Sequence, residues 1–345
     1  IQPMDDEHRW YRYHRLFQRL LRNELARRVG PAEIGTIHLR ASAWYAGRNR
    51  IQLAIRHALA GQDTQAAIRL VAQHRHHLLN TEQRPRLEQW LDLFPSEVIA
   101  GDPDLLLSRA WIVHHGRYAA QTVLDMVAEA QVLVDQMADQ PERARPLQGE
   151  IDTLVSIRQS FQASDPQAVI ERTTRALEMM PPERYLVRSA AWLHLALAYQ
   201  MTGQLDKARA VFLGTQAEDS AVPGSPRARN VGSSCFVHWI AADLPSLMQA
   251  AQVTVRVGQR VDLFESCTWA QHFLACACYQ RNELDSAEQH ARAVEQRRYA
   301  AHPTCVLHNA YVLGAIQQAR GLPAQAHQAL EAACTFMRAR RSEPL

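Results

Sequence analysis

The chain has 345 residues, of which 47% are hydrophobic and only 7% are aromatic, and its formal net charge is +3. Ala, Leu, Gln, Arg and Glu dominate, which favours helices and argues against an all-β fold. The charge is too small, and its two signs too evenly mixed, to predict contact with nucleic acid. There is no run of about 18 apolar residues, so we expect no membrane span and a cytoplasmic setting.

The first part of the chain predicts short helices. Residues 10–21 form an amphipathic pattern whose apolar stripe comprises Tyr13, Leu16, Phe17, Leu20 and Leu21. Further helices are predicted at 37–45, 51–59, 64–79 and 86–94, with turns at 47–49 and 61–63. We therefore expect an N-terminal helical section over residues 1–100.

A longer unit recurs beyond that section, and Leu195–Phe212 is its clearest copy. Small Ala196 and large Tyr199 share a helical face, Gly203 tolerates a left-handed turn, and Ala208 allows close packing of the second helix. The predicted turn positions are Gly116, Ala163, Gly203, Ala242, Asn282 and Gly321. Their spacing, mostly about 40 residues, exceeds the roughly 34 of tetratricopeptide repeats.

This period predicts an all-α fold, a right-handed superhelix of tetratricopeptide-like helix-turn-helix repeats over residues 101–345. Proline-rich segments at 140–146, 181–183 and 220–226 are expected to be loops between units. Because stacked repeats expose an extended surface, this architecture favours binding or assembly over catalysis.

Three segments carry a family resemblance: WYRYHRLFQRLL, LRASAWYAGRNRIQLAIRHALAGQDTQAAIRLV and LEQWLDLFPSEVIAGDPDLLLSRAWIVHHGRYAAQTVL. In this order they resemble the MalT-like, LuxR-type, ATP-dependent regulators of transcription of the STAND class. The resemblance covers roughly residues 5 to 135. It implies that an NTPase module with its winged helix precedes this region and that a superhelical sensor follows. It also implies that the full-length protein self-associates into an ATP-bound assembly.

The first helix of each unit is expected to line the concave side of the array. A helical stripe counted back from the turns gives the candidate ligand-binding residues Arg229, Phe236, Trp239, Trp269, His272, Tyr279, His308, Tyr311 and Gln318. Such a groove suits a small polar inducer or a regulatory protein. The alternative is that these aromatic rings pack between neighbouring repeats. If Trp269 lines the groove, Trp269→Ala should lower the free energy of unfolding by under about 1 kcal/mol.

Motifs for other chemistry are absent from the sequence. It contains no GxxxxGK[ST], GxGxxG, GxSxG or HExxH, so we expect neither an ATP site nor an enzyme in this segment, and no cofactor. His74-Arg-His-His77 lacks accompanying carboxylate or Cys ligands, and no metal is expected there. The six cysteines have no CxxC spacing and are expected to be reduced core residues.

The sequence leaves two functions open. The first is the ligand-sensing and oligomerisation domain of a LuxR-type regulator, without direct contact to DNA or a membrane. The second is a protein-binding scaffold or the regulatory tail of a bacterial serine/threonine kinase. Flanking domains would separate them, since a P-loop NTPase marks the regulator and HRD and DFG motifs mark the kinase.

Overall fold

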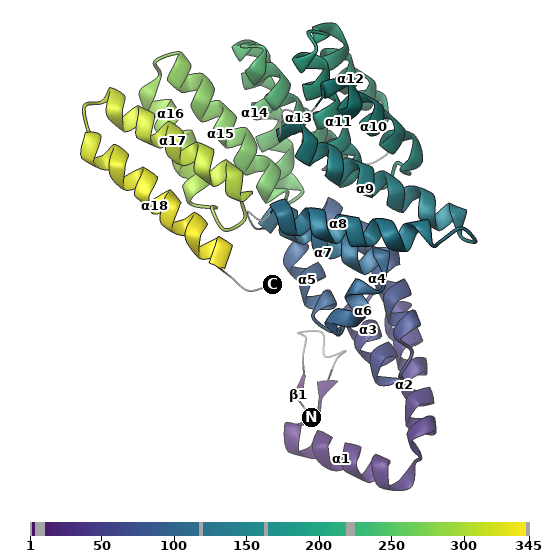
Figure 1. Ribbon diagram of the computed structural model, residues 1–345. Helices are drawn as coiled ribbons and strands as arrows, with labels where there is room; N and C mark the ends of the chain where they lie inside the picture. The colour runs from purple at the N-terminus through teal and green to yellow at the C-terminus, as the bar shows by residue number, and fades with distance from the viewer. Residues whose placement is uncertain (1, 4–10, 117–119, 162–164, 219–224, 343–345) are drawn as a thin grey trace. The chain divides into compact units, whose positions relative to one another are not determined.

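A computed structural model describes residues 2–3, 11–116, 120–161, 165–218 and 225–342 (Figure 1). Within them the secondary-structure elements are helices, apart from two strands of two residues each. The expected all-α fold is confirmed. The chain divides into two compact units, residues 1–73 and 74–345, which are described separately. The expected division into residues 1–100 and 101–345 stays a prediction.

Unit 1 contains a small strand pair and the first helices. Strand β1 (Gln2–Pro3) pairs antiparallel with β2 (Tyr11–Arg12), and the helices are α1 (Arg15–Arg28), α2 (Pro31–Ala46), α3 (Ile51–Ala60) and the first part of α4 (Thr64–Asn80). The helix predicted from residue 10 therefore begins too early, because Tyr11 and Arg12 are extended. The stripe of α1 contributes no buried residue, and Leu16 and Leu20 are among its exposed side chains.

Helices α2 and α3 of unit 1 are joined by polar contacts as well as apolar packing. Ser42 donates to the carbonyl of Ala54 over 2.8 Å, and the Nδ1 atoms of His38 and His57 lie 2.9 Å apart. Burial, and then the neighbouring His38, lower the pKa of His57. The predicted turns at 47–49 and 61–63 are present, with Asn49 and Gln62 at positive φ.

Unit 2 is a series of helices that pack on their neighbours in the chain (Figure 1). After the end of α4 come α5 (Arg84–Leu91), α6 (Ser96–Ala100), α7 (Pro103–Gly116), α8 (Ala120–Asp135), α9 (Pro141–Phe161), α10 (Pro166–Met179), α11 (Tyr185–Met201), α12 (Leu205–Glu218), α13 (Ser225–Ile240), α14 (Leu244–Arg260), α15 (Phe264–Gln280), α16 (Leu284–Glu295), α17 (Pro303–Ala319) and α18 (Pro323–Ser342). The predicted repeat array is confirmed for these described helices.

The turns of the array have the predicted chemistry. Gly203, Ala242, Asn282 and Gly321 all have positive φ. At each, the next residue donates its backbone N–H to a carbonyl five residues earlier, as from Gln204 to Tyr199. This is the bond that closes a Schellman motif, and it stops one helix and reverses the chain. Gly116 instead ends α7 without a positive φ, and Ala163 lies outside the described residues.

Two predicted loops differ from the structure. Residues 141–146 belong to α9, and Pro146 lies inside that helix. Pro141 is at the first position of α9, where a backbone N–H would have no partner within the helix, so its missing N–H is tolerated. Beyond Pro146, the buried side chains of Leu147, Glu150 and Ile151 hold the helix in place. The loop at 181–183 is present, whereas the one at 220–226 lies outside the described residues up to 224, and α13 begins at Ser225.

Candidate functional site

The first helices of successive repeats form one continuous layer. Helix α11 packs on α13, α13 on α15, and α15 on α17, in addition to the contacts between sequence neighbours. Among the described residues no comparable contact joins the second helices α12, α14, α16 and α18 to one another. Because the first helices approach each other more closely than the second helices do, we call their layer the inner face of the array. That this layer is concave stays a prediction.

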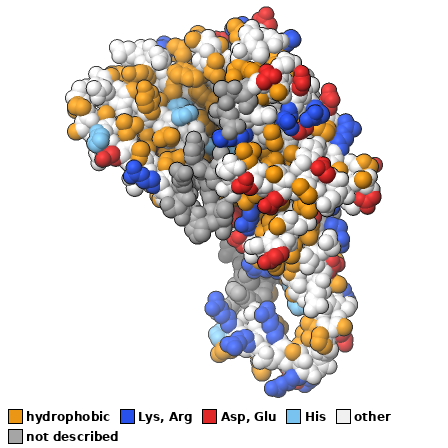
Figure 2. Space-filling view, in the orientation of Figure 1, with side chains coloured by type: hydrophobic (Ala, Val, Ile, Leu, Met, Phe, Trp, Pro, Cys, Tyr) orange, Lys and Arg blue, Asp and Glu red, His pale blue; other side chains and the backbone are white. Residues whose placement is uncertain are grey.

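Trp269, on α15, is the centre of an aromatic–imidazole patch on this layer, which we define as Phe236, Trp269, His272, His302 and His308. The ring of Trp269 lies 4.9 Å from Phe236, 5.9 Å from His272, 6.1 Å from His302 and 6.2 Å from His308, measured between centroids. His272 and His308 are 6.0 Å apart. Figure 2 shows hydrophobic side chains gathered on the visible face of the array, with a histidine among them.

The imidazoles of the patch are neutral at physiological pH. Burial lowers the pKa of His272 to about 3, with the neighbouring His308 as a second cause, and lowers the pKa of His302 to about 4. Burial also lowers the pKa of His308, which is the most exposed of the three. A neutral imidazole offers one donor and one acceptor. The patch can therefore hydrogen-bond a ligand without requiring that the ligand be charged.

The structure brings together four of the nine predicted residues, namely Phe236, Trp269, His272 and His308. Trp239 is half-buried between the core of α13–α15 and that of α15–α17, and Tyr279 packs in the latter, as the alternative interpretation expects. Tyr311 and Gln318 are exposed on α17, and Tyr311 is 72% exposed.

Arg229 has a different role from the one predicted. It is buried, and its guanidinium donates to the backbone carbonyl of Asn80 over 3.0 Å and lies 3.4 Å from the carboxylate of Glu82. It therefore joins α13 to the end of α4 and does not face an open groove.

Sequence reasoning missed the polar group beside the patch. His302 contacts Trp269 on one side and His114 and His115 on the other, with centroids 5.7 Å and 5.8 Å away. His115 also lies 2.9 Å from the buried carboxylate of Glu265. The adjacent pair His114-His115 is visible in the sequence, but nothing there indicates that α7 lies beside α15 and α17.

Cys276 and His272 resemble a nucleophile and its base only in spacing. They lie one helical turn apart on α15, with Sγ 3.6 Å from Nε2. Burial raises the pKa of Cys276 to about 12, as it lowers that of His272. A thiol nucleophile requires a lowered pKa, so this pair is not activated.

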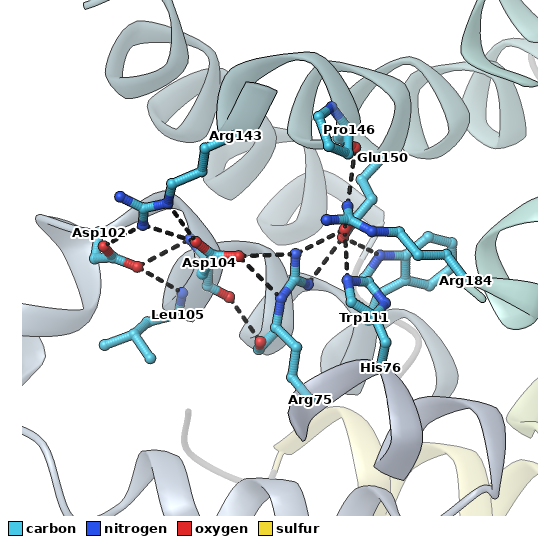
Figure 3. A network of polar contacts seen from close by, with 11 residues as sticks. Arg75, His76, Asp102, Asp104, Leu105, Trp111, Arg143, Pro146, Glu150 and Arg184 are labelled. Atoms are coloured by element: carbon cyan, nitrogen blue, oxygen red, sulfur yellow. Dashed lines mark hydrogen bonds and ion pairs between the residues drawn. The ribbon is translucent and has the colours of Figure 1, made fainter. Parts of the chain in front are cut away.

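An arginine–carboxylate network, defined as Arg75, Asp102, Asp104, Arg143, Glu150 and Arg184, lies among α4, α7, α9 and α11 (Figure 3). Arg75 is completely buried and donates to both oxygens of Glu150 over 2.9 and 2.6 Å. It also donates to Asp104 over 3.2 Å. Trp111 and Arg184 donate to Glu150 as well.

The charges of this network neutralise one another. Burial by itself raises the pKa of Glu150, but the charges of Arg75 and Arg184 outweigh it and hold that pKa well below its usual value. Burial lowers the pKa of His76 to about 4, so its contact with Glu150, 2.9 Å from Nε2, involves a neutral ring. A buried, mutually satisfied ion network fixes the packing of helices and leaves no carboxylate available for proton transfer.

No cluster of three or more potential metal ligands occurs in the described part of the chain. His76, one of the histidines of the 74–77 segment, faces Glu150 of the network instead. No described helix is long and apolar enough to cross a membrane.

Comparisons with known proteins support the resemblance suggested by the sequence. A family model described as the MalT winged helix domain matches residues 1–33. The HTH-type transcriptional regulator MalT of Serratia proteamaculans is 28% identical over 224 residues, and that of Vibrio campbellii is 23% identical over 208 residues. The chain is similar to the MalT-like regulators.

The shared region is a limited part of these MalT relatives. The two matches cover 64% and 60% of this chain but only 24% and 22% of the regulators. The serine/threonine-protein kinase PknK of Mycobacterium tuberculosis is 31% identical over 111 residues, which are 32% of this chain and 10% of the kinase. The resemblance to the winged helix extends into this chain, whereas we expected the winged helix to precede it.

Proposed function

We propose that this MalT-like chain is the ligand-sensing and oligomerisation region of a LuxR-type, STAND-class transcription regulator. The similarity to MalT over more than half of the chain supports the regulatory setting, and the repeat array supports a binding role. In this proposal the inner face binds a small-molecule inducer or a regulatory protein, and the full-length protein self-associates. A transcription regulator of this kind acts in the cytoplasm.

The observation that carries the proposal is the aromatic–imidazole patch. Trp269 is half-buried, His308 is exposed, and the imidazoles near them are neutral. An aromatic face beside uncharged donors and acceptors favours an uncharged polar ligand, because an ion would find no opposite charge within the patch.

A thermal-shift screen of uncharged and charged metabolites tests it. An uncharged compound that raises the melting temperature should lose its effect in His308→Ala, whose exposed side chain can be removed with little change in packing. His327→Ala is the matched control, because His327 is also exposed but lies on α18. Stabilisation that persists in both His308→Ala and Trp269→Phe would place the ligand elsewhere and overturn the proposal.

We further propose that the chain has no catalytic role and binds neither ATP nor DNA directly, since its sequence lacks a P-loop and its charge is balanced. Titration calorimetry with ATP should show no submicromolar binding, and a duplex DNA probe should show no salt-sensitive shift.

The similarity to PknK favours one alternative, the protein-binding regulatory tail of a serine/threonine kinase. An intact protein that carries a P-loop NTPase beside this region would support the regulator. HRD and DFG motifs in the same position would support the kinase.

A further inference from the structure

The turn between α4 and α5, residues Asn80–Arg84, is bound to three inner helices that are distant in sequence. Asn80 donates from its side-chain amide to the carbonyl of Glu183 over 2.7 Å and accepts from the N–H of Leu186 over 2.9 Å. Its backbone carbonyl accepts from Arg229. The turn therefore contacts the start of α11 and the first part of α13.

Glu82 makes the corresponding contact with α15. Its carboxylate accepts from the backbone N–H of Glu265 over 2.6 Å and from that of Ser266 over 3.2 Å. The hydroxyl of Ser266 donates to it over 2.8 Å. Arg84, at the end of the turn, pairs with the side chain of Glu265. One turn thus binds the first residues of two inner helices and a buried arginine of the helix between them.

These contacts supply caps that α11 and α15 lack in their own sequence. The residues at their N-cap positions, Arg184 and Leu263, make no side-chain capping bond. The first N–H groups of a helix have no partner within the helix. Helices elsewhere in the array solve this locally: α10 is capped by Asp165 and α14 by Asp243. In α11 and α15 the caps come from Asn80 and Glu82, about 100 and 180 residues earlier.

The turn has the same geometry as the other turns of the array. Glu82 has φ of 57°, and the N–H of Gln83 donates to the carbonyl of Leu78 over 2.8 Å, as in the turns at Gly203 and Asn282. The buried carboxylates of Glu82 and Glu265 depend on Arg229, Arg84 and His115 for opposite charge or hydrogen bonds.

We propose that residues Asn80–Arg84 form a clasp that caps α11 and α15 together, so that the loss of one cap weakens the other. The two caps are coupled because one short turn carries all the contacts. When Glu82 leaves α15, the positions of Asn80 at α11 and of the carbonyl that Arg229 binds change as well. This coupling does not depend on the proposed ligand class.

Hydrogen exchange of the 345-residue chain, followed by mass spectrometry, tests the clasp. In Glu82→Gln, exchange should rise roughly fivefold or more at the start of α15 and also at the start of α11, which Glu82 does not touch. Asn80→Ala should give the reciprocal result, with faster exchange at α15 as well as at α11. Two independent variants guard against a single one that folds poorly.

Asp165→Ala is the matched control, because it removes an ordinary local cap that accepts from Gln167. It should raise exchange at the start of α10 only. Three results would overturn the clasp: an effect confined to the helix whose cap was removed, no effect at either helix, or an equal loss of protection throughout unit 2, including α18. None of them bears on ligand binding, which the thermal-shift screen tests separately.

Discussion

The arginine–carboxylate network and the aromatic–imidazole patch lie in the same unit but satisfy buried polar groups in opposite ways. The network keeps its groups charged and pairs each with an opposite charge, as between Arg75 and Glu150. The patch keeps its imidazoles neutral by burying them beside aromatic rings, as between His272 and Trp269. The first arrangement holds helices in place, and the second can change state when a proton or a ligand arrives.

The largest expected effect comes from removing the central cation of the network. Arg75→Met should lower the free energy of unfolding by about 3–5 kcal/mol, because Glu150 and Asp104 would be left buried without their partner. Urea denaturation of the wild-type chain and the variant measures this loss. Arg69→Met, at an exposed position of the same helix, is the control and should change stability by under about 0.5 kcal/mol. Equal losses of stability in Arg75→Met and Arg69→Met would mean that the network does not hold these helices together.

The next largest effect is expected from pH, which should change the stability contributed by the patch more than that contributed by the network. In the folded state the pKa values of His272 and His302 of the patch are about 3 and 4, below the usual 6.5. Burial also lowers the pKa of His194, which lies on α11 outside the patch, to about 4. Between these values and 6.5 the unfolded chain binds more protons, so stability is complete above about pH 6.5 and falls as the pH decreases. We expect a loss of about 2–4 kcal/mol between roughly pH 7 and 5.5.

The carboxylates of the network should not contribute to that loss. The pKa of Glu150 is held well below its usual 4.5, so its stabilisation is present above about 4.5 and is lost only as the pH falls through the lower, folded-state pKa. The double variant His272→Gln, His302→Gln should flatten the dependence of the melting temperature on pH between neutrality and 5.5. His327→Gln, at an exposed position, should leave it unchanged. An unaltered slope in the double variant would show that these rings do not titrate as proposed.

Trp269→Ala should have an intermediate effect of about 2 kcal/mol. The ring is half-buried and packs against Phe236 and Phe273, so its removal leaves part of the cavity that a fully buried tryptophan would leave. The smaller loss that the sequence-based groove predicts applies to an exposed ring, which Trp269 is not. Thermal or urea unfolding decides between the two, and a loss under about 1 kcal/mol would favour the groove.

Tyr311→Ala should have the smallest effect, under about 0.5 kcal/mol, because its side chain is largely exposed on α17. The same unfolding measurement applies, and Tyr311→Phe controls for the hydroxyl group. A cost comparable with that of Trp269→Ala would mean that Tyr311 packs in a core in solution.

The amino-acid sequence by itself determined the all-α repeat architecture and its turns. The reason is local: Gly203, Ala242, Asn282 and Gly321 tolerate or prefer a left-handed conformation, and small residues such as Ala208 and Ala287 follow them where helices pack closely. Helical spacing together with the repeat could likewise place Phe236 and Trp269 at corresponding positions of their two helices, α13 and α15.

Only the tertiary structure decided which polar groups meet. Arg229 fitted the predicted stripe, but its partners Asn80 and Glu82 lie about 150 residues earlier, and no periodicity connects them. In the same way, the caps of α11 and α15 depend on how residues Asn80–Arg84 approach these helices. The proximity of His115 to Glu265 depends on how α7 approaches α15. Spacing in sequence specifies a face of one helix, whereas capping and charge pairing require two segments to arrive at the same point in space.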